Sequence, residues 1–252
     1  MADGEWLMAR EGDCYQPSAI SHTLRRSVFK DREEAGRLLA ERLAGYRGVP
    51  ACLVLALPRG GVAVAYPISR ALGLPLDVFI TRKLGAPGDP EYAIGAVAET
   101  GGIYLNPRAR EVLDLYHVSD DYLEHAVHVQ QQEIARRQTL YRFGRPVPIL
   151  RGRTILLIDD GIATGATFLA SVQALKTCGL HRLVAAIPVG PIDILATVAR
   201  HVDELVVLEQ PEWFCAVGNH YVDFTQVDDH DVLRYLQAAA EDRHGGHRTT
   251  VA

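Results

Sequence analysis

The sequence has few cysteines and no long apolar run. Its four cysteines, at positions 14, 52, 178 and 215 of 252, form no Cys-x-x-Cys pair, and a chain of this length needs no disulfides to build a core. No apolar run approaches the roughly 20 residues that span a membrane. The acidic beginning, MADGEWLMAREGD, lacks the basic-then-apolar order of a signal peptide. We therefore expect a soluble protein of the reducing cytoplasm, with no membrane partner.

A strong charge of either sign is also missing. The formal net charge of −5 offers no electrostatic footprint for a polyanion, so we do not expect nucleic acid as a partner. The chain contains neither the GxxxxGK[ST] signature of P-loop proteins nor the GxGxxG signature of dinucleotide-binding enzymes. A nucleotide hydrolase and a dinucleotide-dependent enzyme therefore lack their usual support.

Apolar runs alternate along the chain with helical patterns. We expect strands at 51–57, 76–80, 155–158, 183–187 and 204–208. We expect helices at 31–48, 62–72 and 192–200, a helix that starts at 106–107, another from about 119, and one between the third strand and residue 178. This alternation predicts an α/β domain, doubly wound around a mostly parallel sheet. We place the domain at 28–237, between a loose arm (1–27) and a mobile tail (238–252). The Gly/Pro-rich segment TRKLGAPGDPEYAIG (81–95) predicts a long mobile loop.

The segment ILLIDDGIATGAT (155–167) carries the most specific signal. Asp159 and Asp160 follow an apolar strand, at the sheet edge where α/β proteins bind ligands. The glycines and the hydroxyls of Thr164 and Thr167 then lie at a helix N-terminus, which suits a phosphate. Since carboxylates repel phosphate, they should meet ligand hydroxyls or a divalent cation instead. A phosphorylated sugar with a free diol fits both halves, although an acidic pair can also simply cap a turn.

This segment resembles the phosphoribosyl-pyrophosphate (PRPP) signature of type I phosphoribosyltransferases. The segments LALPRGGVAVA, TRKLGAPGDPEYAIGAVAE and WFCAVGNHYVDFTQVDD are similar to a bacterial branch of that family, over roughly residues 29–236. The resemblance implies an α/β domain of the type I kind with a small hood region. It also implies Mg²⁺ as cofactor and, by analogy, a homodimer.

The resemblance implies roles for individual residues. Asp159 and Asp160 would bind the ribose 2- and 3-hydroxyls and meet Mg²⁺ indirectly, through ribose or water. The 5-phosphate would lie in a cradle formed by Ala163, Thr164, Gly165, Ala166 and Thr167. Residues 57–61, with Arg59, Gly60 and Gly61, match the pyrophosphate loop, where a cis peptide often precedes the first glycine; here that bond would be Arg59–Gly60.

Three cations are candidates for the departing diphosphate. Arg59 would act beside Mg²⁺, while Arg82 and Lys83, at the root of the expected loop, would close over the diphosphate and exclude water. Asp159, Asp160, Arg59 and Lys83 form our catalytic set. For each cation the alternative is a solvated surface charge, which is also how we read the arginines of EIARRQTLYRFGR.

The acceptor end is less defined. Ala163 stands where members that recognise 6-oxopurines carry a third acidic residue, so that substrate class is disfavoured. Trp213, Phe214 and Val217 are candidates to hold a planar acceptor by stacking, unless they are core residues. Glu99 reads either as a cleft residue or as an ordinary strand end, and no residue stands out as a general base.

Two functions remain open. The first is an enzyme that transfers 5-phosphoribosyl from PRPP to an unidentified nitrogenous acceptor. The second is a regulatory protein that senses PRPP without chemistry. Retention of Arg59 and of the Arg82–Lys83 pair favours the enzyme, because sensing alone needs no closing lid.

Overall fold

A five-stranded sheet forms the centre of the protein. The computed structural model describes residues 28–87, 89–105 and 120–245. The sheet contains, in spatial order, β2 (Leu76–Val78), β1 (Cys52–Ala56), β6 (Thr154–Ile158), β7 (Arg182–Val189) and β8 (Glu204–Glu209). All neighbours pair in parallel. Every residue of β1 and β6 is buried, as expected for strands that are covered on both faces.

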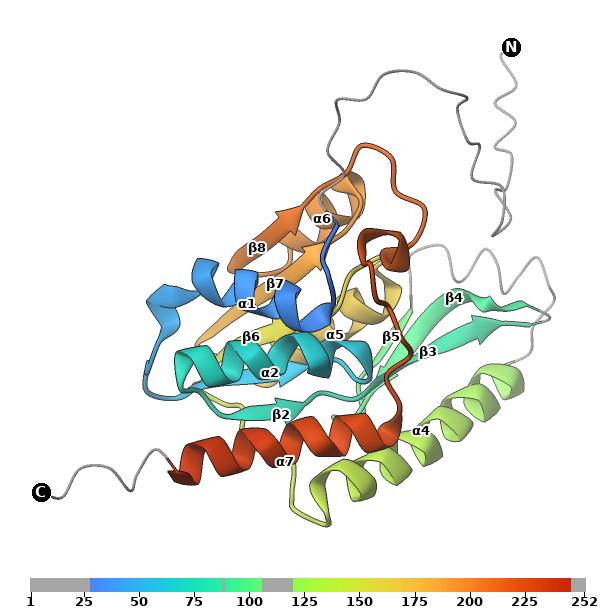
Figure 1. The fold of residues 1–252 in the computed structure, drawn as a ribbon. Helices are drawn as coiled ribbons and strands as arrows, with labels where there is room; N and C mark the ends of the chain where they lie inside the picture. Colours follow the sequence, from blue (N-terminus) through green and yellow to red (C-terminus); the bar gives the residue numbers. More distant parts are fainter. Residues whose placement is uncertain (1–27, 88, 106–119, 246–252) are drawn as a thin grey trace, which may run out of the picture.

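Helices cover both faces of this sheet (Figure 1). One face packs against α1 (Arg32–Arg42), α2 (Gly60–Leu72) and α7 (Asp229–Gly245), in a core where Val54 and Leu156 meet Leu39 and Ile68. The other packs against α5 (Ala166–Lys176) and α6 (Ile192–Ala199). Since successive strand residues point to opposite faces, Leu55 lies in the second core. The predicted doubly wound, mostly parallel α/β fold is confirmed.

The segment expected to be a mobile loop is instead a sheet. β3 (Thr81–Ala86), β4 (Asp89–Ala98) and β5 (Ile103–Leu105) pair antiparallel in that order. The helix α4 (Asp120–Arg142) packs on this sheet, and Leu84, Ile94 and Ile134 share one core. The loop prediction for 81–95 is therefore wrong. The Gly/Pro composition corresponds to irregular register between Leu84 and Ala86, not to an absence of strands.

Two short segments form a hood over the carboxyl ends of the parallel strands. We define the hood as residues 28–32 and 210–228, which include the 3₁₀ turn η2 (Val217–His220). The Phe29 N–H donates to the His220 carbonyl and the Val222 N–H to the Phe29 carbonyl, both at 2.8 Å. The rings of Phe29 and Tyr221 pack at 5.4 Å between centroids. Residues almost 200 positions apart in the sequence are thus joined within the hood.

The C-terminal helix runs past the predicted end of the domain. The helix α7 continues through Gly245, so residues 238–245 are helical, and the mobile tail stays a prediction. The arm at 1–27 and the helix start expected at 106–107 lie outside the described residues.

A second 3₁₀ turn, η1 (Ala44–Tyr46), follows α1. No helix in the described ranges is both long and apolar enough to cross a membrane.

The cysteines are not all free. Cys52 and Cys178 are free thiols, whereas Cys215 is disulfide-bonded. The scattered spacing of the four cysteines did not predict a disulfide.

Candidate active site

The acidic pair lies at the carboxyl end of β6. The Asp160 N–H donates to Asp159 Oδ1 at 2.9 Å, so the two side chains are part of one tight turn. Burial, together with the negative charge of Asp160, raises the pKa of Asp159 well above its usual range. A buried carboxyl beside another carboxylate is costly to ionise. Neither side chain is a simple solvated turn cap.

The loop after the pair presents unpaired backbone donors. The N–H groups of Thr164, Gly165, Ala166 and Thr167 donate to no acceptor within the described ranges, and no side chain caps α5. Gly165 adopts φ +74, a conformation that glycine accepts without strain. Ala163 and Thr164 are exposed, whereas Ala166 and Thr167 are half-buried. Free N–H groups with a helix dipole behind them form a site for an anion.

The loop after β1 touches the acidic pair. A β-carbon on Gly60 would lie 1.9 Å from Asp160 Oδ2, and one on Gly61 would lie 2.9 Å from the Ile158 carbonyl. Only glycine allows this approach. The cis peptide falls between Pro58 and Arg59, one bond earlier than predicted, so the Arg59–Gly60 assignment is wrong. Arg59 itself is half-buried at the start of α2.

Arg32, which the sequence patterns did not single out, holds Asp160. Its Nε donates to Asp160 Oδ2 at 2.7 Å and its Nη1 donates to the Thr225 carbonyl at 2.9 Å. Its guanidinium lies 3.7 Å from the Phe224 ring centroid. The Tyr221 hydroxyl adds a 2.6 Å bond to the Asp160 carbonyl. The hood thus fixes both the side chain and the backbone of Asp160.

A cluster of arginines faces the loop after β1. Burial and the positive charges of Arg137 and Arg59 lower the pKa of Arg82. Arg82 and Lys83 lie on β3, not at the root of a loop, and the Arg82 Nε donates to Gln130 of α4. Arg137 is 11% exposed and donates to Glu133 at 2.7 Å, so reading it as a solvated helix arginine was wrong. The cluster contains Arg59, Arg82 and Arg137.

The aromatic candidates differ in exposure. Trp213 is 85% exposed, whereas Phe214 stacks on His220 with an interplanar angle of 13°. Val217 packs against Gly161, where an added β-carbon would lie 2.4 Å from Val217 Cγ1. Only Trp213 keeps an exposed aromatic surface, so stacking on an acceptor remains a prediction for it and for Phe214.

Glu99 is a structural residue. Its side chain is fully buried and pairs with Arg142 at 2.6 Å. Arg142, itself buried, also pairs with Asp77 at 3.1 Å and donates to the Val78 carbonyl at 2.6 Å. A buried charge needs this kind of complete pairing. Glu99 therefore anchors the end of β4 to β2 and α4 and does not line the site.

The acidic pair offers a cation at most one oxygen of each carboxylate. Asp160 Oδ2 is occupied by Arg32 and Asp159 Oδ1 by a backbone donor. The one described group of three side chains close enough to hold a metal, formed by Asp228, His230 and Asp231, lies at the start of α7. That Asp159 and Asp160 meet Mg²⁺ through water or a ligand hydroxyl stays a prediction.

Comparisons with known proteins agree with this geometry. Residues 30–217 match the phosphoribosyl transferase domain family, and the chain belongs to that family. Two curated relatives from Mycobacterium tuberculosis, strains CDC 1551 / Oshkosh and H37Rv, are each named a "Putative phosphoribosyl transferase". Each is 43% identical to this chain over 215 residues, which are 85% of this chain and 48% of the relative. The chain thus spans about half the length of these relatives.

A solved structure is also similar over most of its length. TT1426 from Thermus thermophilus has 42% identity and a TM-score of 0.70, covering 84% of this chain and 98% of that one. The family expected from the acidic signature is therefore confirmed, and so is the fold.

Proposed function

We propose that the protein transfers the 5-phosphoribosyl group of PRPP to a nitrogenous acceptor and releases pyrophosphate. One observation carries this proposal: the loop after β1 touches the acidic pair, and the unpaired N–H groups at the start of α5 follow the pair within the same loop. The contact between Gly60 and Asp160 joins two loops that follow neighbouring parallel strands. Together they offer groups for a diol, a terminal phosphate and a diphosphate.

The sugar is held from two sides. Asp159 and Asp160 accept hydrogen bonds from the ribose 2- and 3-hydroxyls, while the N–H groups of 163–167 and the hydroxyls of Thr164 and Thr167 hold the 5-phosphate. Arg32 takes one oxygen of Asp160 and leaves the other for the sugar. Binding at two fixed points orients the C1–O bond toward the diphosphate side, which lowers the entropy lost on reaction.

The bond that breaks joins C1 of the ribose to the diphosphate oxygen. As it lengthens, positive charge develops on the sugar and negative charge on the diphosphate, so prearranged opposite charges stabilise the transition state. Arg59, Arg82 and Arg137 supply positive charge on the diphosphate side, and the carboxylates lie on the sugar side. Lys83 follows Arg82 on β3, so its side chain points to the opposite face of that strand, and its role at the diphosphate stays a prediction.

Mg²⁺, when bound with PRPP, would neutralise diphosphate oxygens and help the pyrophosphate leave. Asp159 and Asp160 would hold it only through water or the ribose hydroxyls. The acceptor would enter beneath the hood, next to Phe214 and Trp213, and attack C1 from the face opposite the pyrophosphate.

The direct test is to incubate the protein with PRPP and Mg²⁺ together with a panel of bases and amines, and to measure pyrophosphate release. We expect release with one acceptor class and its loss in Asp160→Asn. Tight PRPP binding without turnover for any acceptor would instead support the sensing function. Absence of PRPP binding would refute both.

A further inference from the structure

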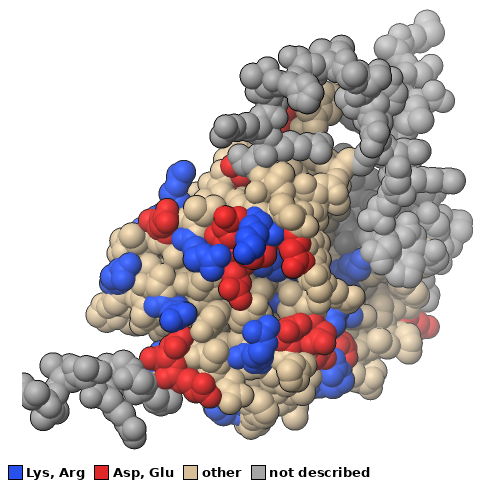
Figure 2. Space-filling view, in the orientation of Figure 1, with Lys and Arg blue, Asp and Glu red and all other residues tan. Residues whose placement is uncertain are grey.

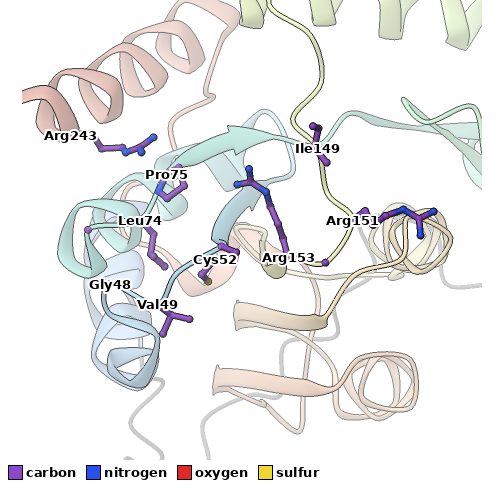
Figure 3. A pocket seen from close by; sticks show the side chains of 12 residues that line it. Gly48, Val49, Cys52, Leu74, Pro75, Ile149, Arg151, Arg153 and Arg243 are labelled. Atoms are coloured by element: carbon purple, nitrogen blue, oxygen red, sulfur yellow. The ribbon is translucent and has the colours of Figure 1, made fainter.

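A cavity lies at the amino ends of the parallel strands, at the edge of the sheet opposite the candidate active site. It has a volume of about 500 Å³ and is bounded by the turns that precede β1, β2 and β6 and by the end of α7 (Figure 3). The candidate active site lies at the carboxyl ends of the strands, so the central sheet separates the two. This cavity therefore belongs to no part of the proposed reaction.

Its charged lining residues are all arginines. Arg151, Arg153 and Arg243 line the cavity, and its lining contains no acidic residue. The chain as a whole has a net charge of −5, so this local excess of positive charge does not follow from its composition. On the face shown in Figure 2, by contrast, acidic and basic side chains are interspersed.

These arginines have no partners in the described part of the chain. None of the three makes a side-chain hydrogen bond or an ion pair there, whereas Arg32, Arg137 and Arg142 are all paired. Figure 3 shows Arg153 and Arg243 reaching toward Pro75 from two sides, with Arg151 directed away from them. Two converging, uncompensated guanidinium groups attract an anion.

The walls that carry these groups are fixed by backbone hydrogen bonds. The Arg153 N–H donates to the Leu150 carbonyl at 3.1 Å, and its carbonyl accepts from His181 at 2.9 Å. On the other wall, Ser69 Oγ donates to the Leu74 carbonyl at 2.6 Å. Ligand binding would therefore order only side chains, which limits its entropic cost.

The other residues that line the cavity carry no negative charge. Burial raises the pKa of the Cys52 thiol to about 11, so this side chain stays neutral at physiological pH. Val49, Leu74 and Ile149 provide apolar surface, and Ile149 is 77% exposed. A cavity of this size suits a small molecule, whereas a nucleic acid would need a long basic surface.

We propose that this cavity is a binding site for a small polyphosphate anion, held mainly by Arg153 and Arg243. The site is independent of the proposed transfer reaction and lies on the far side of the sheet from it. Each arginine–phosphate contact contributes about tenfold or more to affinity.

Calorimetric titration with inorganic pyrophosphate, without divalent cations and at low ionic strength, tests this proposal. The titration uses Arg59→Gln as the background, so that binding near the acidic pair is weakened. We expect one site that remains in Arg59→Gln and weakens about 100-fold on adding Arg153→Gln and Arg243→Gln. Unchanged affinity in that triple variant would overturn the proposal.

A charge-matched control separates a defined site from diffuse attraction. Arg37→Gln with Arg200→Gln removes the same charge from exposed positions that do not line the cavity. Affinity should stay within about twofold of the background protein, since exposed charges are screened. Equal weakening by both pairs would also overturn the proposal. Thermal unfolding of each variant checks that the fold is intact.

Discussion

Arg32 Nε lies 2.7 Å from Asp160 Oδ2, and this contact joins the hood to the acidic pair across 128 residues of sequence. Both side chains are largely buried, at 10% and 16% exposure. The pair therefore contributes to the fold and also sets the orientation of Asp160.

Replacing Arg32 should weaken both stability and PRPP binding. In Arg32→Gln, Asp160 loses its charged partner and the hood loses the bond to Thr225, at a cost of about 2–3 kcal/mol in the free energy of unfolding. PRPP affinity should fall about tenfold, because Asp160 is no longer oriented. Urea unfolding and calorimetry measure the two effects. A double-mutant cycle with Asp160→Asn should give a coupling of about 1 kcal/mol or more; additive effects would contradict the role of the pair.

Asp159→Asn should stabilise the ligand-free protein at neutral pH while removing function. The pKa of Asp159 is raised in the folded state, so the folded protein binds this proton more tightly than the unfolded chain does. The stability that the protonated carboxyl contributes is complete below the usual carboxyl pKa of about 4. It is lost as the pH rises from there through the raised pKa of the folded state. The variant should have a higher Tm at pH 7, and the difference should vanish toward pH 3.

The same variant should lose about 100-fold in PRPP-dependent turnover, because an amide neither carries the charge nor accepts both hydrogen bonds. Thermal scans across pH and pyrophosphate release measure the two effects. A lower Tm at pH 7 would show that the buried charge is compensated in the folded state.

Gly60→Ala should disable the site by a steric effect. The new β-carbon would overlap Asp160 Oδ2, 1.9 Å away, and Arg32 holds that carboxylate in place. We expect a loss of about 1–3 kcal/mol in stability and at least a tenfold loss in PRPP affinity. Gly45→Ala is the matched control, since nothing lies within 4 Å of its added carbon. Equal behaviour of the two variants would contradict the close contact.

Arg137→Gln should weaken PRPP binding about tenfold, because its charge faces Arg82 and Arg59 beside the expected diphosphate. Arg136→Gln is the control: Arg136 contacts the same Glu133 but is 51% exposed, and its loss should change affinity less than twofold. Titrations at several salt concentrations should give a smaller salt dependence for Arg137→Gln only. A similar loss in both variants would show that α4 acts through overall charge.

Local signals in the sequence were enough to predict the central sheet and the acidic pair. The apolar run before Asp159 is recognisable as a buried strand without knowledge of its neighbours. The glycines after it indicate a loop in which the backbone comes close to a ligand. The hairpin of β3 and β4 was missed because its strands are defined by pairing, such as Lys83 with Ala96, and not by alternation of apolar residues. Arg32 was missed for a related reason, since its partner lies on a distant loop.

The pairing of β1 with β6 places two loops of the candidate site on one support. Because β1 and β6 are hydrogen-bonded neighbours, the loops that carry Gly60 and Asp160 share one rigid base. The 70 or so residues between Ile80 and Leu150 therefore form an insertion that leaves and re-enters this base. Arg82 and Arg137, which we propose for the diphosphate, lie within this insertion. If that proposal holds, relatives can lengthen or exchange the insertion only where these two side chains are kept, whereas the hood, a separate part of the chain, can vary independently of it.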